Sequence, residues 1–525
     1  MHGTIAQPRA FYDAPRNLAV YDAPELFAQL QSTVPEARVL SARHIAMPLS
    51  VHSNQVCRWL GLPALPLLDL WKYDWPGRYK PFEAQRVTAN FLAAHPRAFV
   101  LSDMGTGKTL ATLWAADFVL ACNPGMKALV VAPLSTLQRV WSDAVFQNFM
   151  TRRTSVIVHG SKQQRLKALE QNVDFYIINY DGVGVIADVL KMRPDIQLVI
   201  IDEASAYKDA STKRHKLARK TIADRQYLWV MTGTPTPNGP IDAYGLAMLV
   251  NRAGGETFAS YKSRVMTQVS RFIWVPKHGS HEAAHKLMQP SVRFKISDCM
   301  DLPPCTIQTR DVELSPEQQK AYQDLKRHAT LLMKDGRITP ANEAVLRGKL
   351  IQIACGAVYS GSDKLRKTHH LDVRPRLAAL EELMEQATAK IIVFAPLTSV
   401  VDLLYAAFKD KYSCRIINGA VSQKERSDIF SAFEETDEPR VLFADPATMA
   451  HGLTLVRASM SVWFGPTDRT ELYLQANKRF DRPGQINPTT VVNLAATPIE
   501  REIYKRLETN TNMQGLVLKL ARGEL

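Results

Sequence analysis

Short apolar, β-branched runs alternate with helical patterns along most of the chain from about residue 97 onward. The first series reads AFVL, ALVVAPL, SVIVHG, DFYIINY, LVIIDEAS and YLWVMTGT, and a second series reads KIIVFAPL, CRIINGA, RVLFADP, SVWFGP and TVVNLAA. Nearly continuous apolar strands separated by helices are typical of a parallel sheet covered on both faces. The pattern therefore predicts an α/β fold with two lobes, each built on a parallel sheet.

The remaining parts of the chain lack this rhythm. The segment SPEQQKAYQDLKRHATLLMK indicates a helix with Ser315 as its cap and Pro316 in its first turn. Near the N-terminus, ARHIAMPL is expected to form a strand and SNQVCRWLGL a helix. We therefore expect a small N-terminal accessory module over residues 1–78, a first lobe over 79–255, helical insertions and an interlobe linker over 256–370, and a second lobe over 371–525.

Composition narrows the class of protein. Lys and Arg number 65 against 51 Asp and Glu, a formal charge of +14, which favours a polyanionic partner such as nucleic acid, with simple solubility as the competing interpretation. The six cysteines show no paired short spacing, so a reducing, cytoplasmic setting fits best. No apolar run is long enough to span a bilayer, and the N-terminal residues lack the apolar core of a signal peptide, so we expect no membrane role.

The stretch SDMGTGKTL follows a strand and opens a helix, which is the context that a P-loop requires. Backbone N–H groups at such a helix start point at phosphate oxygens, Lys108 would balance the charge of the β- and γ-phosphates, and the Thr109 hydroxyl can hold Mg²⁺. The first position of the motif is Ser102 rather than glycine. The residues expected to bind the nucleotide here are Met104, Gly105, Thr106, Gly107, Lys108, Thr109 and Leu110.

A second element supports the same chemistry, because LVIIDEAS ends an apolar strand in two consecutive acids. Asp202 is expected near the metal, and Glu203 is expected to orient and deprotonate a water that attacks the γ-phosphate. The alternative interpretation is a strand that ends in two surface acids without a function. A P-loop in the same sheet argues against this interpretation. Upstream, Gln85 can read the adenine edge with paired donor and acceptor, although a solvent-facing glutamine fits the residue equally well.

The second lobe carries QANKRFDRPGQ near its end. Gln475, Arg479 and Arg482 are spaced four and three apart, so on a helix they would share one face. Guanidinium groups aimed at a phosphate from across a cleft complete phosphoryl transfer, whereas a salt-bridged surface helix is the alternative. With the P-loop on one lobe and the arginines on the other, ATP would complete its site only when the lobes close, and hydrolysis would let them part.

Six motifs, SDMGTGKT, APLSTL, IDEAS, TGTPTPN, HGLTL and QANKRFDRPGQ, occur in the order of superfamily-two helicases. The detail resembles the Swi/Snf family of ATP-dependent DNA translocases, and DEASAYKDASTKRHKLARK, DLPPCTIQTRDVELSPEQQKAYQDL and the RPGQ tail narrow the match, over about residues 79–510. The resemblance implies two RecA-like lobes with ATP and Mg²⁺ as ligands. It implies nucleotide contacts at Gln85, Gly105, Gly107, Lys108 and Thr109, catalysis by Asp202 and Glu203, and transition-state stabilisation by Gln475, Arg479 and Arg482.

The resemblance also implies that APLSTL, TGTP and the HGLTL region line the DNA or couple it to the nucleotide, through Pro133, Thr232 and Gly452. Two departures matter. Ser205 stands where many relatives have His or Asp, which puts its usual link to the TGTP strand in doubt, and PATMAHGLTL is not glycine-rich, so only Gly452 and Leu453 carry over. The chain ends soon after the second lobe without histone-reading modules, so it resembles the short forms of bacteriophages and bacteria, and we expect it in the cytoplasm of a bacterial or phage-infected host cell.

Two further stretches carry candidate chemistry. STKRHKLARK predicts a helix with basic residues over much of its surface, and Lys213, Arg214 and Lys216 are candidate phosphate contacts, with a merely solvated helix as an equal alternative. HEAAH, from His281 to His285, formally matches a zinc-protease pattern, but it lies in a segment that resembles the interlobe region of the translocases. We therefore expect no metal there, and expect Mg²⁺ at Thr109 and Asp202.

The leading hypothesis from the sequence is a motor that moves along double-stranded DNA by cycles of lobe closure. The alternative is a helicase that unwinds or anneals DNA or RNA with the same engine, which would bring single-stranded DNA or RNA as partner; the sequence shows no clear inserted hairpin to separate strands. A scaffold with a degenerate nucleotide site is a third hypothesis. Five intact residues argue against it, namely Lys108, Asp202, Glu203, Arg479 and Arg482. We expect a monomeric motor, and a protein partner recruited by residues 1–78 is left open.

Overall fold

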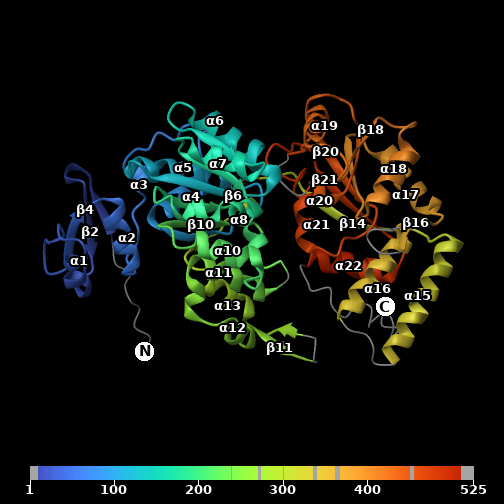
Figure 1. The fold of residues 1–525 in the computed structure, drawn as a ribbon, viewed down its shortest axis with the longest axis horizontal. Coiled ribbons are helices and arrows are strands. Elements are labelled where there is room, and N and C mark those ends of the chain that lie inside the picture. Colours follow the sequence, from blue (N-terminus) through green and yellow to red (C-terminus); the bar gives the residue numbers. More distant parts are fainter. Residues whose placement is uncertain are drawn as a thin grey trace. The chain divides into compact units, whose positions relative to one another are not determined.

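The computed structural model describes residues 10–237, 239–269, 274–299, 301–334, 340–360, 367–449 and 454–509. The chain divides into two compact units, each with one parallel sheet (Figure 1). The first unit comprises Met1–Thr236, Ile241–Lys262 and His281–Cys299, and the second comprises Pro237–Pro240, Ser263–Ser280 and Met300–Leu525.

A seven-stranded parallel sheet forms the centre of the first unit. In spatial order its strands are β13 (Ser291–Val292), β5 (Arg97–Val100), β10 (Tyr227–Met231), β9 (Ile196–Ile201), β6 (Lys127–Ala132), β8 (Phe175–Asn179) and β7 (Ser155–Val158). The central strands β9 and β10 are buried almost throughout, because helices cover both faces, so their sequences are continuously apolar. All six strands predicted from the first series of apolar runs are confirmed.

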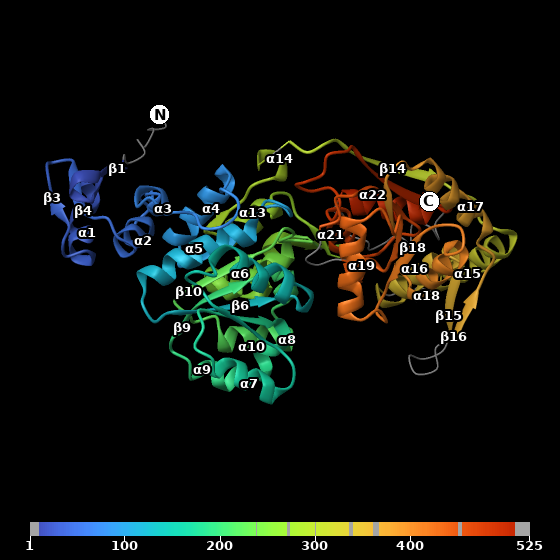
Figure 2. The same cartoon turned by 90° about the horizontal axis from the view of Figure 1, so that it is seen from above.

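Helices lie on both faces of this sheet. Figure 2 shows α4 (Glu83–Ala94) and α5 (Lys108–Cys122) on one face of strands β6, β9 and β10, and α8 (Tyr180–Val185) and α10 (Lys213–Thr221) on the other. Further helices of the first unit are α3 (Leu67–Leu70), α6 (Asp143–Phe149), α7 (Lys162–Glu170), α9 (Ala187–Lys191), α11 (Ala243–Val250), α12 (Phe258–Val265), α13 (Ser280–Leu287) and α14 (Ile296–Cys299). Helix α5 buries ten of its fifteen residues, so the helix that begins at the P-loop is anchored in the core.

The N-terminal residues of the first unit form a small α/β module. Its antiparallel sheet has the order β1 (Ala10–Asp13), β2 (Leu18–Asp22), β4 (His44–Pro48) and β3 (Arg38–Val39), and its helices are α1 (Phe27–Thr33) and α2 (Val51–Trp59). Strand β4 and helix α2 confirm the elements expected over ARHIAMPL and SNQVCRWLGL. Apolar side chains of this module and of the seven-stranded sheet belong to one hydrophobic core.

A six-stranded parallel sheet forms the second unit. Its strands, in spatial order, are β14 (Cys305–Asp311), β21 (Thr489–Ala495), β20 (Ala458–Trp463), β17 (Lys390–Phe394), β19 (Val441–Ala444) and β18 (Cys414–Ile417). Its helices are α15 (Pro316–Lys334), α16 (Pro340–Ala354), α17 (Arg374–Gln386), α18 (Thr398–Phe408), α19 (Gln423–Glu435), α20 (Pro446–Met449), α21 (Thr470–Asn477) and α22 (Pro498–Glu508). The five strands predicted from the second series of apolar runs are confirmed.

The stretch 256–370, in which helical insertions and a linker were expected, also contains strands. Strands β11 (Met266–Gln268) and β12 (Trp274–Pro276) form one antiparallel hairpin, and β15 (Ala357–Ser360) and β16 (Lys367–His370) form another. Strands β13 and β14 extend the two parallel sheets as edge strands. Six of the seven residues of β14 are exposed, so this strand lacks the continuous apolar run by which the central strands were predicted. The helix expected from Ser315 onward is confirmed as α15, and the backbone N–H of Gln318 donates to the Ser315 hydroxyl.

An aromatic segment, residues 71–76, packs along the P-loop helix α5. The Trp71 ring lies 5.6 Å from that of Phe118, and the Trp75 ring lies 5.4 Å from that of Trp114. The indole N–H of Trp114 donates to the Pro76 carbonyl at 2.8 Å. The segment that joins the N-terminal module to α4 is thus fixed against α5.

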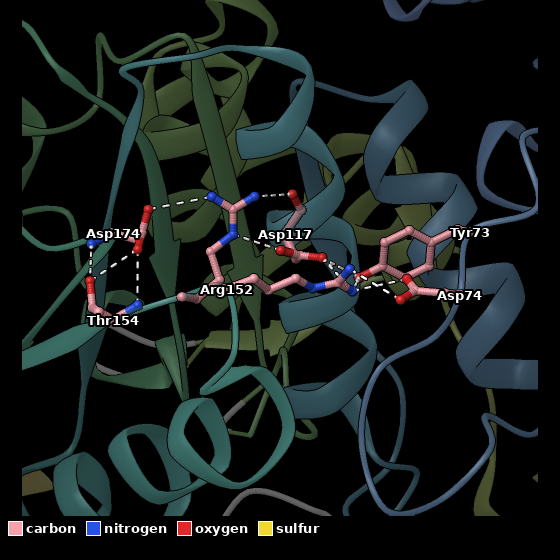
Figure 3. Close-up of polar contacts among 7 residues, drawn as sticks. Tyr73, Asp74, Asp117, Arg152, Thr154 and Asp174 are labelled. Atoms are coloured by element: carbon pink, nitrogen blue, oxygen red, sulfur yellow. Dashed lines mark hydrogen bonds and ion pairs between the residues drawn. The ribbon is translucent and has the colours of Figure 1, made fainter.

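Asp117 of α5 is a buried carboxylate at the centre of a polar network (Figure 3). It accepts hydrogen bonds from the Tyr73 hydroxyl and from Arg153 Nε, both at 2.6 Å, and it pairs with Arg152 at 3.0 Å. Arg152 also pairs with Asp74 at 3.0 Å. Burial, together with the Asp117 charge, raises the pKa of Tyr73, so this hydroxyl stays a proton donor.

The same network reaches the edge of the seven-stranded sheet. Arg153 pairs with Asp174, which directly precedes β8, and Asp174 accepts from the backbone N–H and hydroxyl of Thr154, which directly precedes β7 (Figure 3). One buried carboxylate therefore joins the aromatic segment, α5 and the starts of two strands.

We expect Asp117→Asn to lower the free energy of unfolding by about 2 to 3 kcal/mol, because it leaves two guanidinium groups without their shared carboxylate. This expected loss of stability is smaller than that for a fully buried ion pair, because the Arg152 side chain is 33% exposed. Urea denaturation followed by tryptophan fluorescence measures the change. Asp188→Asn is the control: its carboxylate is 99% exposed and, among the described residues, pairs with Lys191 on the same helix, so a change within about 0.5 kcal/mol is expected. Equal losses in both variants would contradict a central role for Asp117.

Candidate nucleotide site and nucleic-acid interface

The P-loop closes around its own lysine. Gly105 and Gly107 have φ values of 85° and 70°, a left-handed conformation that glycine adopts without steric cost, and Gly107 is the N-cap residue directly before α5. The Lys108 ammonium donates to the carbonyls of Ser102 and Asp103, each at 2.8 Å. The backbone N–H groups of the first turn of α5 and this ammonium therefore share one loop, an arrangement suited to phosphate oxygens.

Ser102, the departure from glycine in the motif, has a structural role. Its side chain is buried, and its hydroxyl accepts a hydrogen bond from the backbone N–H of Phe294 at 3.0 Å. The backbone N–H of Asp103 in turn donates to the Phe294 carbonyl at 2.9 Å, which continues the pairing of β5 with β13 into the P-loop. The segment after β13 thus fixes the first half of the loop.

Gln85 lies against the P-loop. Its side-chain oxygen accepts from the backbone N–H of Phe82 at 3.2 Å, and its amide nitrogen donates to the Gly107 carbonyl at 3.3 Å. A Cβ atom at position 107 would come within 2.2 Å of this nitrogen, so a side chain there would displace the Gln85 amide. The Gln85 side chain is therefore held at the loop by hydrogen bonds to the backbone of other residues. Its contact with adenine stays a prediction.

The two acids follow β9. The Asp202 carboxylate is buried and accepts two hydrogen bonds at 2.9 Å, from the Trp141 indole N–H on Oδ2 and from the backbone N–H of Glu203 on Oδ1. Burial and the Glu203 charge raise the pKa of Asp202 to about 6, while the Trp141 donor and the Lys108 ammonium act in the opposite direction. The structure thus brings the P-loop lysine and the acid pair together, as expected for strands whose carboxyl ends meet at one edge of a sheet.

Glu203 adopts a left-handed backbone conformation, with φ at 45°, which is uncommon for a residue other than glycine. The Tyr180 hydroxyl donates to the main-chain carbonyls of Asp202 at 2.8 Å and Glu203 at 3.0 Å. Sequence reasoning missed both Tyr180 and Trp141. Tyr180 directly follows the apolar strand β8, and Trp141 lies in the turn after the apolar strand β6. Both strands end at the sheet edge that carries the acids, so this position is the signal that could have identified the two residues.

The TGTP and APLSTL motifs lie at the same sheet edge. Thr232 is buried, and its backbone N–H donates to the Val100 carbonyl at 3.0 Å, in the strand that enters the P-loop. A Cβ atom at Gly233 would lie 3.0 Å from Met104 Cγ, so the TGTP segment and the P-loop are in close contact. Pro133 is buried after β6, whereas the adjacent Leu134 is 48% exposed. The roles of these residues toward nucleic acid stay predictions.

Helix α10 presents the basic run. The Thr212 hydroxyl accepts from the backbone N–H of His215, and the buried His215 ring donates to the Gly245 carbonyl at 2.8 Å. Burial lowers the pKa of His215, so the ring is neutral at pH 7. Lys213 and Lys216 are exposed. One face of the helix therefore packs on the lobe, and its lysines face solvent.

Arg214 contacts both α8 and the aromatic side chain beside the acids. It pairs with Asp181 at 2.8 Å, and its guanidinium lies 5.7 Å from the centre of the Tyr180 ring. A pocket of about 580 Å³ opens between α8 and α10. Its lining comprises Tyr180, Asp181, Val183, Gly184, Val185, Ala206, Thr212, Lys213, Arg214, Leu217 and Ala218.

In the second unit, the prediction that Gln475, Arg479 and Arg482 share a helix face is wrong, because α21 ends at Asn477. Gln475 is buried on α21 and donates to Glu471 at 3.1 Å, whereas the two arginines lie in the turns that follow. Spacing alone could not reveal where the helix stops.

The RPGQ sequence forms a turn. The backbone N–H of Gln485 donates to the Arg482 carbonyl at 3.0 Å, and Gly484 has a φ of 98°, as in a type II turn with proline and glycine at its centre. Burial lowers the pKa of Arg482 below the usual arginine value. The carbonyl of Arg479 accepts from the backbone N–H of Leu455 at 2.8 Å. Gly452 and Leu453 lie outside the described residues.

The remaining sequence candidates are placed as follows. His281 and His285 lie on α13, and His285 contacts Gln289 at 3.2 Å. Within the described ranges, no group of three or more His, Cys, Asp or Glu side chains is arranged to hold a metal ion. In that same part of the chain, none of the helices combines the length and apolarity needed to cross a membrane.

Comparison with known families gives two matches. The model of the SNF2-related domain matches residues 85–354, and that of the Helicase conserved C-terminal domain matches residues 375–484. The first match includes the P-loop, the acid pair and much of the stretch expected as insertion and linker. The second includes both arginines.

Individual proteins also resemble the chain. Protein p41 of Acyrthosiphon pisum secondary endosymbiont phage 1 is 25% identical over 472 residues, which cover 84% of this chain and 98% of p41. The DNA repair and recombination protein RAD54-like of Drosophila persimilis is 22% identical over 474 residues, and this chain spans 60% of its length. The solved Sulfolobus solfataricus SWI2/SNF2 ATPase core in complex with dsDNA is 20% identical, with a TM-score of 0.39 and coverage of 86% and 94% of the two chains.

If Asp202 is the magnesium ligand that the sequence predicts, we expect magnesium-dependent ATP binding to weaken about tenfold between pH 7.5 and pH 5, because this carboxyl, with its pKa at about 6, is then mostly protonated. Glu203→Gln removes the neighbouring charge that raises this pKa, so the midpoint should move to lower pH. Fluorescent-nucleotide titrations across pH, with and without magnesium, measure both midpoints. Protonation of ATP itself is common to both proteins, so coincident midpoints would contradict the coupling of the two acids.

Proposed function

Because the chain belongs to the SNF2-related family, we propose that it is an ATP-dependent motor that moves along double-stranded DNA. The observation that carries the proposal is the meeting of Lys108, Asp202 and Glu203 at one edge of the first sheet. Nucleoside-triphosphate hydrolases combine the same three features: a phosphate-binding loop, a buried metal-binding carboxylate and an adjacent base.

In the proposed reaction, ATP binds at the start of α5. The N–H groups of the residues from Met104 to Leu110 and the Lys108 ammonium hold the phosphates, and Gln85 reads the adenine. Thr109 and Asp202 supply hydroxyl and carboxylate oxygens, which Mg²⁺ prefers, and the proximity that lets Lys108 lower the pKa of Asp202 fits a triphosphate between them. The metal would neutralise charge on the phosphates. Glu203 orients and deprotonates the attacking water.

The second unit supplies the groups that complete the proposed site. Gln475, Arg479 and Arg482 would approach the γ-phosphate when the two units close, and the guanidinium groups would stabilise the charge that develops there. Burial already disfavours the charged form of Arg482, so this guanidinium gains more from an anionic partner than a fully hydrated one would. Cycles of binding, closure, hydrolysis and opening are the proposed source of movement.

The nucleic-acid surface of the first unit would comprise the loops after β6 and β10 and the exposed face of α10. Pro133 and Thr232 belong to these loops, and Lys213, Arg214 and Lys216 belong to the helix. Lysines at the surface contact phosphates without reading bases, which suits a motor that must not stop at a preferred sequence. Gly452 is the proposed contribution of the second unit. The DNA repair name of the RAD54-like relative agrees with DNA as the track.

A strand-separating helicase is the second candidate, and a specific observation favours it. The hairpin of β15 and β16, which the sequence did not predict, has all four residues of its second strand exposed. A projecting hairpin can act as a wedge between strands. Duplex translocation remains the first proposal because the family match concerns the SNF2-related domain, and a wedge is an addition to the same engine. A non-catalytic scaffold would not need the buried acid pair.

A comparison of nucleic acids tests the function. We expect duplex DNA to stimulate ATP turnover at least tenfold more than single-stranded DNA or RNA, and we expect the protein to displace the third strand of a triplex without unwinding a duplex. Glu203→Gln is the control, since it should bind ATP but neither hydrolyse it nor displace the third strand, because the attacking water has lost its base. Unwinding with strong stimulation by single strands would select the helicase instead.

Arg482→Ala tests the proposed shared site. Removing the guanidinium that stabilises the transition state should reduce DNA-stimulated turnover about 10³-fold while DNA affinity stays within about twofold. Arg482→Lys should also be impaired, because lysine keeps the charge but lacks the planar fork. Arg457→Ala is the matched control, as Arg457 pairs with Asp437 on the same unit and is 46% exposed. Loss of DNA affinity with unchanged turnover at saturating DNA would show that Arg482 is not the finger.

A further inference from the structure

Two aromatic side chains connect the expected nucleic-acid surface of the first unit to the catalytic acids. Trp141 lies in the π-helical turn Leu137–Ser142, which follows the APLSTL loop, and Tyr180 is the first residue of α8. One donates to the carboxylate of Asp202 and the other to the main-chain carbonyls of Asp202 and Glu203. Neither residue belongs to the P-loop or to the acid pair.

We propose that Trp141 and Tyr180 are positioning residues that transmit occupation of the nucleic-acid surface to the acid pair, and so make ATP hydrolysis depend on bound nucleic acid. The proposal rests on the proposed function, because it names how the same catalytic site is regulated. Neither side chain is assigned a direct contact with ATP or with the reacting atoms.

Trp141 fixes the orientation of the Asp202 carboxylate. The indole is fully buried, and its N–H holds Oδ2 while the backbone N–H of Glu203 holds Oδ1, so the carboxylate cannot rotate without losing a hydrogen bond. Gln138, in the same turn as Trp141, is exposed, as is Leu134 in the preceding loop. A ligand that binds these exposed residues would therefore contact the same turn of backbone that positions the Trp141 indole. Single π-helical turns are frequent at functional sites, which suits this role.

Tyr180 restrains the backbone of the acid pair. Its single O–H proton is shared by two consecutive carbonyls, and the second belongs to Glu203, whose φ of 45° is sparsely populated. The Tyr180 ring packs edge-on against Tyr207, with 5.5 Å between ring centres. Loss of this restraint would free Glu203 to relax toward a more common conformation and would move the catalytic carboxylate.

Arg214 brings the signal to Tyr180. Its guanidinium contacts the Tyr180 ring and pairs with Asp181, which is 73% exposed, so water weakens that ion pair. A phosphate at Lys213 and Arg214, on the rim of the pocket between α8 and α10, can replace Asp181 as the partner of the guanidinium. The exchange would shift Arg214 relative to the ring that holds the acid pair.

The test removes each donor and keeps the ring. Tyr180→Phe and Trp141→Phe should each reduce the ratio of turnover at saturating duplex DNA to turnover without DNA by at least tenfold, while DNA affinity, measured by fluorescence anisotropy, stays within about twofold. Tyr207→Phe is the matched control. In the part of the chain that the structure describes, the Tyr207 hydroxyl is buried and has no hydrogen-bond partner, so its removal should leave the ratio unchanged.

A second readout separates positioning from mere support of the fold. Trp141→Phe removes a donor to the Asp202 carboxylate, so kcat at saturating duplex DNA should fall at least tenfold while the KM for ATP stays within about threefold, whereas Trp229→Phe, which removes a buried indole that donates to the His95 carbonyl, should change neither. Thermal melting identifies variants that do not fold. Should Trp141→Phe fail to fold, Tyr180→Phe, which removes one oxygen atom, carries the test alone.

The outcomes distinguish this inference from the proposed function. An unchanged stimulation ratio in both folded variants, or an equal loss in Tyr207→Phe, overturns the inference and leaves the motor function intact. Stimulation of the parent protein by RNA alone overturns the duplex-DNA function, and the same variants then test the inference with RNA. A parent that no nucleic acid stimulates overturns both.

Discussion

The buried carboxylate of Asp202 is the constraint on which the first unit depends. A charge taken out of water is costly unless donors and a counter-charge replace the lost hydration. Three groups from different parts of the chain do so here: the Trp141 indole, the backbone N–H of Glu203 and the ammonium of Lys108. These groups meet only because β5, β6 and β9 are parallel and end at the same edge. The order of the strands is thus needed both to bury the apolar side chains and to bring the groups that stabilise the Asp202 charge together.

The P-loop is held from outside its own motif. Ser102 and Asp103 bond to Phe294, in the segment that follows β13. The chain leaves the first unit a few residues later, after Cys299, and its next strand, β14, belongs to the second sheet. One of the crossings of the chain between the two units therefore begins a few residues after the segment that holds the phosphate-binding loop. A glycine in place of Ser102 could not make the side-chain bond.

Sequence reasoning identified the elements whose signals are local. The central strands were predicted because burial on both faces makes them continuously apolar, and Lys108 and Asp202 were found because their motifs follow such strands. Strands β13 and β14 were missed because one is very short and the other is exposed. Trp141 and Tyr180 were missed because their partners lie far away in the sequence and are reached only through the sheet. The arrangement of Arg479 and Arg482 was predicted wrongly for another reason: their spacing indicated a helix, but the helix ends at Asn477, and spacing does not show where a helix ends.

The turn that carries Arg482 gives a physical reason for the RPGQ sequence. Proline presets the backbone of the first central position, and glycine supplies the positive φ of the second. The Gln485 side chain then donates to the carbonyls of Val456, Ala458 and Phe480 at 2.8 to 3.1 Å, which ties the turn to strand β20 and to the residues before it. A guanidinium on such a turn has less freedom to lose when it meets a phosphate than one on a mobile loop. Conformational entropy given up during folding need not be given up again at each catalytic cycle, so a rigid turn serves a repeating motor better than a helix end that frays.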